Sequence, residues 1–380
     1  MARDQERRLT RRQKRDQSRE QSSGEPRGSK QARGPQQAPE RQRQQAEERQ
    51  QAEERQQAEE AQEREQQTDR GREAEQPTQV PTAGWRDVAM RVKDQVSKDN
   101  VSLIAAGVGL YGLLAMFPAL TAVVSLYGIF ASPEQVTEQV EQLTDVMPEQ
   151  AAEILGGQLE NLAETGGGAL GAGLVIGFLV ALWSARKGMT ALMTASNIAY
   201  HEEEQRSFLR QLTVSLGLTL GAVVGFVLIV FLGVATPLIL GFLGLGDVLE
   251  GVLSGLRWVV MWLLVVAGLA VVYRYAPDRE PPQWRWVGWG AAIAATLWLI
   301  GSLLFAVYVQ NFGAYGETYG ALGGVVVLLM WFYVTGFVIV LGAEINAELE
   351  RQTSRDTTRG ESRPMGARGA RSADTVGPSP

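Results

Sequence analysis

The residues with the clearest capacity for chemistry lie at the ends of long apolar stretches. Glu344 ends an uncharged run that begins at residue 318, with Asn346 two residues on and Glu348 four residues on. An ionisable group at the edge of a membrane is costly unless it is paired or hydrated. Two interpretations of Glu344 are open. It binds a proton or cation on a transport path, or it pairs with Arg186 or Lys187 as a clamp between helices.

A second group of polar residues follows another apolar run. Thr190, Thr194 and Asn197 are spaced four and three apart, so they share one face of a helix. This face lines a headgroup or anion site, or it hydrogen-bonds to neighbouring helices as small polar residues commonly do in membranes. The complete set of candidates for a polar membrane site is Ser184, Arg186, Lys187, Thr190, Asn197, Glu344 and Asn346.

Several kinds of chemistry are disfavoured by what the chain lacks. It has no cysteine and one histidine, His201, whereas zinc and iron sites usually need several such ligands. His201 precedes three glutamates and is interpreted as the solvated end of a loop. A phosphate-binding Gly-xxxx-Gly-Lys motif is also missing. We therefore expect no metal, no cofactor, no catalytic residue and no enzymatic activity.

Long uncharged runs must position these residues. A membrane-spanning helix needs about 20 consecutive apolar residues, and the chain offers six such segments, at 100–133, 165–185, 211–246, 251–273, 286–316 and 318–343. The fourth contains Arg257, whose long side chain can reach the surface. Pro118 predicts a kink in the first span and is a candidate hinge. The third span has glycines at Gly217, Gly221, Gly225 and Gly233, a spacing that predicts close helix packing.

The connections between the runs indicate their orientation. Residues 134–164 contain eight acidic residues and no Lys or Arg, and their apolar residues recur at helical spacing. We expect them to form an external amphipathic helical segment. Lys and Arg concentrate in alternate connections, which is the distribution of cytoplasmic loops. Both termini are accordingly predicted to be cytoplasmic.

Two tails flank this core. Residues 1–84 hold almost no large apolar residues, so they cannot offset the entropy of ordering. The predicted organisation is a disordered tail at 1–84, a membrane domain at 85–350 and a second disordered tail at 351–380. The basic front half of the first tail is a candidate contact with anionic lipid. No specific nucleic-acid partner is expected.

The core resembles the YihY/BrkB membrane proteins, once called the ribonuclease BN family. The resemblance runs from about Asn100 to Glu350. Six segments carry it, in this order: Leu110–Pro118, Trp183–Ala191, Tyr273–Pro277, Asn311–Tyr315, Thr318–Gly323 and Gly342–Ala347. The family often has Ala-Leu-Asn where this chain has Ala195-Ser-Asn197. The resemblance implies a six-helix protein of the inner membrane.

Three functions are compatible with an all-α polytopic membrane protein of this kind. The first is a transporter, exporter or lipid-handling protein that acts on a small molecule or lipid within the bilayer. The second is a structural or regulatory membrane protein. The third, a tRNA-processing ribonuclease, is disfavoured because it needs clustered metal carboxylates or histidines, and the spans hold acidic residues only near their ends.

Overall fold

The computed structural model describes residues 49–51, 53–58, 61, 68–130, 170–243, 246–312 and 321–378. The chain divides into two compact units, at 1–64 and 65–380. The described residues of the first unit, at 49–51, 53–58 and 61, are helical and exposed. The predicted external segment at 134–164 lies outside the described residues. Pro118 lies within a helix, but its side chain is outside the described part as well.

Six long helices occupy the predicted apolar runs of the second unit. They are α4 (Val101–Phe130), α7 (Leu170–Ala199), α8 (Phe208–Leu243), α9 (Gly246–Tyr275), α10 (Trp284–Phe312) and α12 (Ala321–Glu350). Four segments of the described residues are long and apolar enough to cross a membrane: Phe208–Gly233, Gly251–Tyr275, Trp284–Gln310 and Gly323–Glu350. A fifth is added if α3 (Thr82–Lys98) and the start of α4, which are bent by 67°, count as one span. The prediction of an all-α polytopic membrane protein is confirmed.

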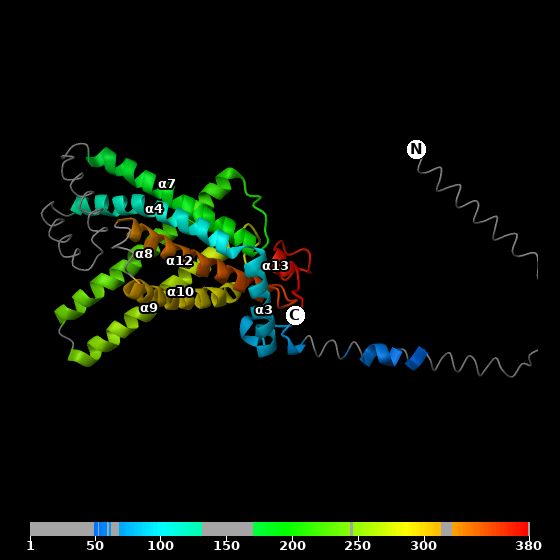
Figure 1. The fold of residues 1–380 in the computed structure, drawn as a ribbon. Helices are drawn as coiled ribbons and strands as arrows, with labels where there is room; N and C mark the ends of the chain where they lie inside the picture. The colour runs from blue at the N-terminus through cyan, green and yellow to red at the C-terminus, as the bar shows by residue number, and fades with distance from the viewer. Residues whose placement is uncertain are drawn as a thin grey trace, which may run out of the picture. The chain divides into compact units, whose positions relative to one another are not determined.

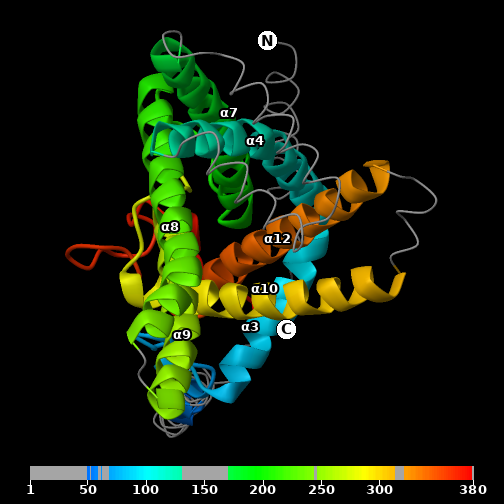
Figure 2. The same cartoon turned by 90° about the vertical axis from the view of Figure 1, so that its left-hand side faces the viewer.

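The helices pack in a continuous series. α4 lies against α7 and α12, α10 lies between α12 and α9, and α8 pairs with α9 and touches α7. Figure 1 shows α3 and α13 (Arg371–Asp374) gathered at one end of this bundle. We call this end, with residues 68–100, 197–208, 274–286 and 344–378, the polar end. In Figure 2, α10 and α12 run beside each other and the α8–α9 hairpin forms one side.

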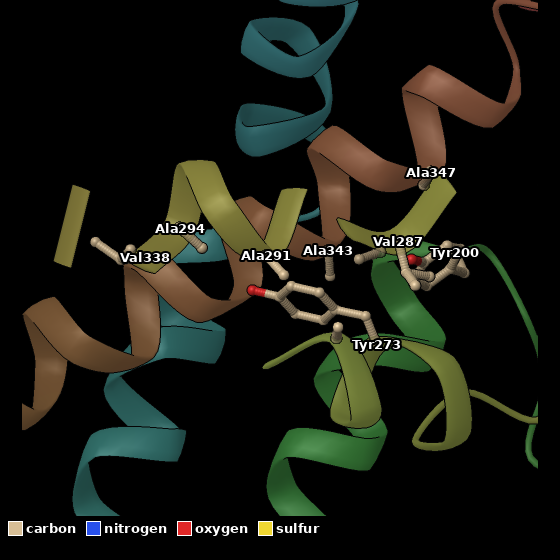
Figure 3. Packing of buried hydrophobic residues seen from close by; sticks show 10 residues of the cluster. Tyr200, Tyr273, Val287, Ala291, Ala294, Val338, Ala343 and Ala347 are labelled. Carbon is tan, nitrogen blue, oxygen red and sulfur yellow. The ribbon is translucent and has the colours of Figure 1, made fainter. Parts of the chain in front are cut away.

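Close approach between α10 and α12 depends on two glycines. A side chain at Gly342 would overlap the Tyr273 hydroxyl and Ala294, and one at Gly290 would overlap Asn346 and the Gly342 carbonyl oxygen. The Tyr273 hydroxyl donates to the Ile339 carbonyl at 2.8 Å. Figure 3 shows the Tyr273 ring beside the small residues of α10 and α12 that this spacing admits.

The glycines of α8 behave differently. A side chain built at Gly217, Gly221, Gly225 or Gly233 meets no atom within 4 Å. The expected close packing along this stripe is therefore wrong within the described structure. The main neighbours of α8 are α7 and α9. Its contacts with them do not run along the glycine stripe.

The helix α3 turns sharply into α4. Its residues Val88 and Val92 pack against Trp286 and Leu349, so its apolar face covers the ends of α10 and α12. Asn100 follows the helix with a φ of 52°, a left-handed conformation that asparagine tolerates better than most residues. This turn sets the 67° bend and brings the end of α3 over the polar end of the bundle.

The segment 351–378 corrects the expectation of a disordered C-terminal tail. Gln352, Thr353 and Thr357 are fully or almost fully buried. The Gln352 amide donates to the Arg70 carbonyl at 2.7 Å, and the Thr353 hydroxyl donates to the Ala74 carbonyl at 2.6 Å. These polar residues are ordered by hydrogen bonds rather than by apolar burial, so the composition argument does not reach them.

The same contacts move the N-terminal boundary from residue 84 to about residue 65. We expect deletion of residues 1–64 to leave the melting temperature in detergent unchanged. Deletion of residues 1–81 should lower it by several degrees, because each lost hydrogen bond contributes about 0.5–1.5 kcal/mol. Differential scanning fluorimetry compares the two deletions directly. Equal melting temperatures for both proteins would contradict the new boundary.

Candidate functional site

A buried carboxyl pair lies at the polar end. Glu344, near the end of α12, is 1% exposed, and neither of its carboxylate oxygens has a hydrogen-bond partner among the described residues. The Asp99 carboxyl, just after α3, lies within hydrogen-bonding reach of it. Within the described part of the chain, the Asp99 Oδ2 atom has no hydrogen-bond partner either. Two carboxylates in a poorly hydrated site repel each other, and a shared proton or a bound cation relieves that repulsion.

His201 links this pair to solvent. Its Nδ1 lies 4.0 Å from Asp99 Oδ2 and 3.0 Å from the Ile198 carbonyl oxygen. Its Nε2 lies 2.5 Å from the Gln95 amide nitrogen. These contacts assign the proton to Nδ1, which donates to Ile198, while Nε2 accepts from Gln95. Side-chain exposure falls from 28% at His201 to 18% at Asp99, so the approach to Glu344 starts at solvent.

A neighbouring carboxylate shows what full compensation looks like. Glu348 Oε2 accepts from Arg91 Nε at 2.5 Å, and its Oε1 accepts from Arg351 Nη1 at 2.5 Å. Arg91 also donates to the Gln352 side chain at 2.8 Å. Glu348 is thus neutralised on both oxygens one helical turn from Glu344, to which the described residues supply no such donor. The difference marks Glu344 as the chemically unsatisfied member of the two.

Arg186 and Lys187 lie elsewhere. Arg186 Nε donates to the Ser215 hydroxyl on α8 at 3.0 Å, and its guanidinium lies 4.8 Å from the Trp183 ring centroid. Lys187 is exposed, with no ion pair to any described residue. The predicted ion pair between Glu344 and Arg186 or Lys187 is therefore wrong.

The other candidate residues lie apart from the carboxyl pair, and only two of them, Asn197 and Asn346, bond to a separate element. The Thr190 hydroxyl donates to the Arg186 carbonyl within α7, as the side chains of membrane threonines often do. Asn197 accepts from the Asp278 amide and donates to Glu204. Asn346 accepts from the Gly290 amide at 2.8 Å and donates to the Val287 carbonyl. Ser184 is half-buried on α7. The seven candidates therefore do not form one site.

The pKa values of two glutamates at the rim of the polar end are shifted in opposite directions. Burial raises the pKa of Glu202, although the Arg371 amide that donates to it acts against this. Burial also acts to raise the pKa of Glu204, but hydrogen bonds from Arg206 outweigh it and hold that pKa below its usual value. Glu204 is therefore a firmly ionised residue beside the loop that carries His201.

Sequence reasoning missed Asp99 and Gln95 and treated His201 as a loop end. The sequence contains little indication of their role. Asp99 is the last charged residue before the first apolar run, and His201 follows α7, the helix that contains the second apolar run. The described residues contain no group of three or more His, Cys, Asp or Glu side chains placed to hold a metal ion.

The helices and the polar end define a polytopic α-helical membrane protein. A family model described as "Virulence factor BrkB" matches residues 92–366, so the chain belongs to the BrkB family. The predicted resemblance is confirmed, and the match extends beyond it at both ends, into α3 and into the segment after α12.

Curated relatives agree with this assignment. The chain is 34% identical over 253 residues to the "Putative ribonuclease-like protein YfkH" of Bacillus subtilis (strain 168), which covers 65% of this chain and 90% of the relative. It is 26% identical over 285 residues to a "UPF0761 membrane protein" of Albidiferax ferrireducens, covering 73% and 66%. A third relative, "UPF0761 membrane protein IL2447" of Idiomarina loihiensis, is 26% identical over 264 residues, covering 67% and 87%. No solved structure matches the chain.

Proposed function

We propose that this protein is a proton-linked transporter or exporter of the bacterial cytoplasmic membrane, and that Glu344 carries the coupling proton. One observation carries the proposal: a carboxyl group at the end of a membrane helix is almost fully buried, receives no hydrogen bond from any residue that the structure describes, and faces a second carboxyl group. Ionisable groups of this kind in membrane proteins commonly lie on proton or ion paths.

The surroundings support a proton rather than a fixed salt bridge. Glu348 shows that the same end of α12 can neutralise a carboxylate with two arginines. The pair Glu344–Asp99 lacks this compensation among the described residues, and His201, whose imidazole can both accept and donate a proton, lies at its outer side. In the proposed relay, Gln95 releases Nε2 of His201, which takes a proton from water. The Nδ1 proton then turns from the Ile198 carbonyl to Asp99 Oδ2, 4.0 Å away, and a proton passes from Asp99 to Glu344.

The orientation in the membrane is part of the proposal. The polar end contains Arg86, Arg91, Lys93 and Lys98 on α3 alone. Lys and Arg are enriched at the cytoplasmic ends of membrane helices. We place the polar end, and with it the carboxyl pair, on the cytoplasmic side.

A structural or regulatory role is the second candidate. The dense hydrogen bonding of residues 68–81 with residues 351–354 favours it, since such a closed end suits a docking surface. This hydrogen-bond network does not explain why Glu344 and Asp99 are buried together. We therefore favour the transport function over a structural or regulatory one.

Replacement of Glu344 by glutamine tests the proposal, because the amide keeps the shape and removes the titrating group. In vesicles that contain a pH-sensitive dye, an imposed membrane potential should drive proton entry through the wild-type protein. We expect Glu344→Gln and Asp99→Asn each to reduce this entry at least tenfold. Glu361→Gln is the matched control, since Glu361 is exposed and should leave the flux unchanged.

Infrared spectra add a readout that needs no transported solute. The wild-type protein should show a protonated carboxyl band near neutral pH that disappears in Glu344→Gln. The proton role would be refuted if protons entered the Glu344→Gln vesicles as fast as the wild-type vesicles and the carboxyl band were unchanged. A flux that depends on the sodium gradient and not on pH would show that the carboxyl pair carries a sodium ion instead of a proton.

A further inference from the structure

Arg186 differs from two other deeply buried arginines, Arg91 and Arg279, in having no carboxylate partner among the described residues. Arg274 also lacks one in that part of the chain, but its Nη1 donates to the Pro282 carbonyl oxygen. Arg91 is paired with Glu348 and Arg279 with Glu350, each at hydrogen-bonding distance. Arg186 is only 9% exposed, yet no carboxylate of the described residues lies within 4.0 Å of it. A buried guanidinium without a counter-charge is costly, so the site is short of one negative charge.

The contacts of Arg186 leave its outer edge free. Its Nε donates to the Ser215 hydroxyl at 3.0 Å, and Ser215 in turn donates to the Leu212 carbonyl at 3.0 Å. The guanidinium also lies over the Trp183 ring. Among the described residues, the two terminal nitrogens of Arg186 have no acceptor. These nitrogens form the fork that binds two oxygens of a phosphate or carboxylate.

The surface around Arg186 changes character along α7. Leu179 and Val180 are exposed and apolar, Trp183 is 51% exposed, and Lys187 is exposed one residue beyond Arg186. An apolar stretch followed by an aromatic and then by basic residues is the sequence of layers at a membrane interface. The depth at which the free edge of Arg186 lies is therefore the depth of lipid headgroups.

We propose that Arg186, Lys187 and Trp183 bind the phosphate of an anionic membrane lipid at the α7–α8 surface. The terminal nitrogens of Arg186 hold two phosphate oxygens. Lys187 supplies a second positive charge from the exposed side, and the apolar residues beside Trp183 contact the acyl chains. This site lies apart from the carboxyl pair and does not depend on proton transport.

Lipid binding to the purified full-length protein tests the site. With phosphatidylglycerol, we expect native mass spectrometry to show a retained lipid and thermal melting to rise by several degrees. Phosphatidylcholine should be retained much less. Arg186→Gln should weaken phosphatidylglycerol binding at least tenfold, and Lys187→Gln, at an exposed position, about threefold. Arg285→Gln is the control, because Arg285 is exposed beside an exposed tryptophan, Trp284.

Two results would overturn the proposal. Equal retention of phosphatidylglycerol by the wild-type protein and by Lys187→Gln would refute the site even if Arg186→Gln failed to fold. Stabilisation by inorganic phosphate that phosphatidylglycerol does not increase would refute a lipid as the source of the phosphate.

Discussion

Glu350→Gln should destabilise the protein by about 3–5 kcal/mol, the usual cost of leaving one member of a buried ion pair without its partner. Glu350 and Arg279 both have side chains that are 0% exposed. They meet through two hydrogen bonds, of 3.1 and 2.6 Å, and the Thr357 hydroxyl donates to the same carboxylate at 2.7 Å. The pair therefore joins α12 to both the loop after α9 and the segment after α12.

The electrostatics agree with a firmly charged pair. Burial alone would lower the pKa of Arg279, but the charge and hydrogen bonds of Glu350 raise it above its usual value. The guanidinium also lies 4.8 Å from the Tyr200 ring centroid. The guanidinium therefore stays charged, and Glu350→Gln leaves it buried without its counter-charge.

A double-mutant cycle measures this effect. The double variant Arg279→Gln with Glu350→Gln should lose less stability than the two single variants together, as judged by melting temperature in detergent. Arg359→Gln is the control, because its ion pair with Glu280 is exposed and such pairs contribute about 0–1 kcal/mol. Additive single-variant losses would show that the two groups do not interact.

Gly290→Ala should be the most damaging single methyl addition at the α10–α12 contact. The new Cβ would overlap the Asn346 side chain and the Gly342 carbonyl oxygen, and backbone cannot move aside as a flexible side chain can. Asn346 would lose its bonds to the Gly290 amide and the Val287 carbonyl. Overpacking costs about 1–3 kcal/mol, and an unsatisfied buried amide costs about 1–3 kcal/mol more.

The α8 glycines supply a matched comparison. Gly221→Ala adds the same methyl group at a position where it meets nothing within 4 Å. Alanine also favours helix over glycine by up to about 1 kcal/mol. We therefore expect the melting temperature to fall by several degrees in Gly290→Ala and to stay level or rise in Gly221→Ala. A comparable fall in both variants would show that the helix contact is not the cause.

The helix positions could be predicted because apolar runs of sufficient length have few alternatives. α8, α9 and α10 begin within a few residues of the predicted runs. α7 continues to Ala199, beyond the predicted span that stops at residue 185, and the helical spacing of Thr190, Thr194 and Asn197 indicated this extension. Beyond that point Thr190 and Thr194 donate back to helix carbonyls, so the helix extends without needing an apolar sequence.

The candidate site could be predicted only in part. Glu344 was identified from its position at the end of an apolar run, but its partner depends on the bend after α3. That bend brings Asp99, from a distant part of the sequence, to the end of α12. Periodicity cannot reveal such long-range contacts. The order of residues 351–378 was missed for a related reason, because their polar groups are satisfied by partners up to 282 residues away.

The union of α3 with the end of α12 has a consequence for how the protein is made. Arg91 and Glu348 are 257 residues apart, and translation delivers them in that order. During synthesis, α3 must remain beside the membrane without its partners until α12 has left the ribosome and entered the bilayer. A stalled or prematurely terminated chain would present Arg91 and the apolar face of α3 uncovered. Closure of this end therefore requires a chain that has been made at least as far as Glu348.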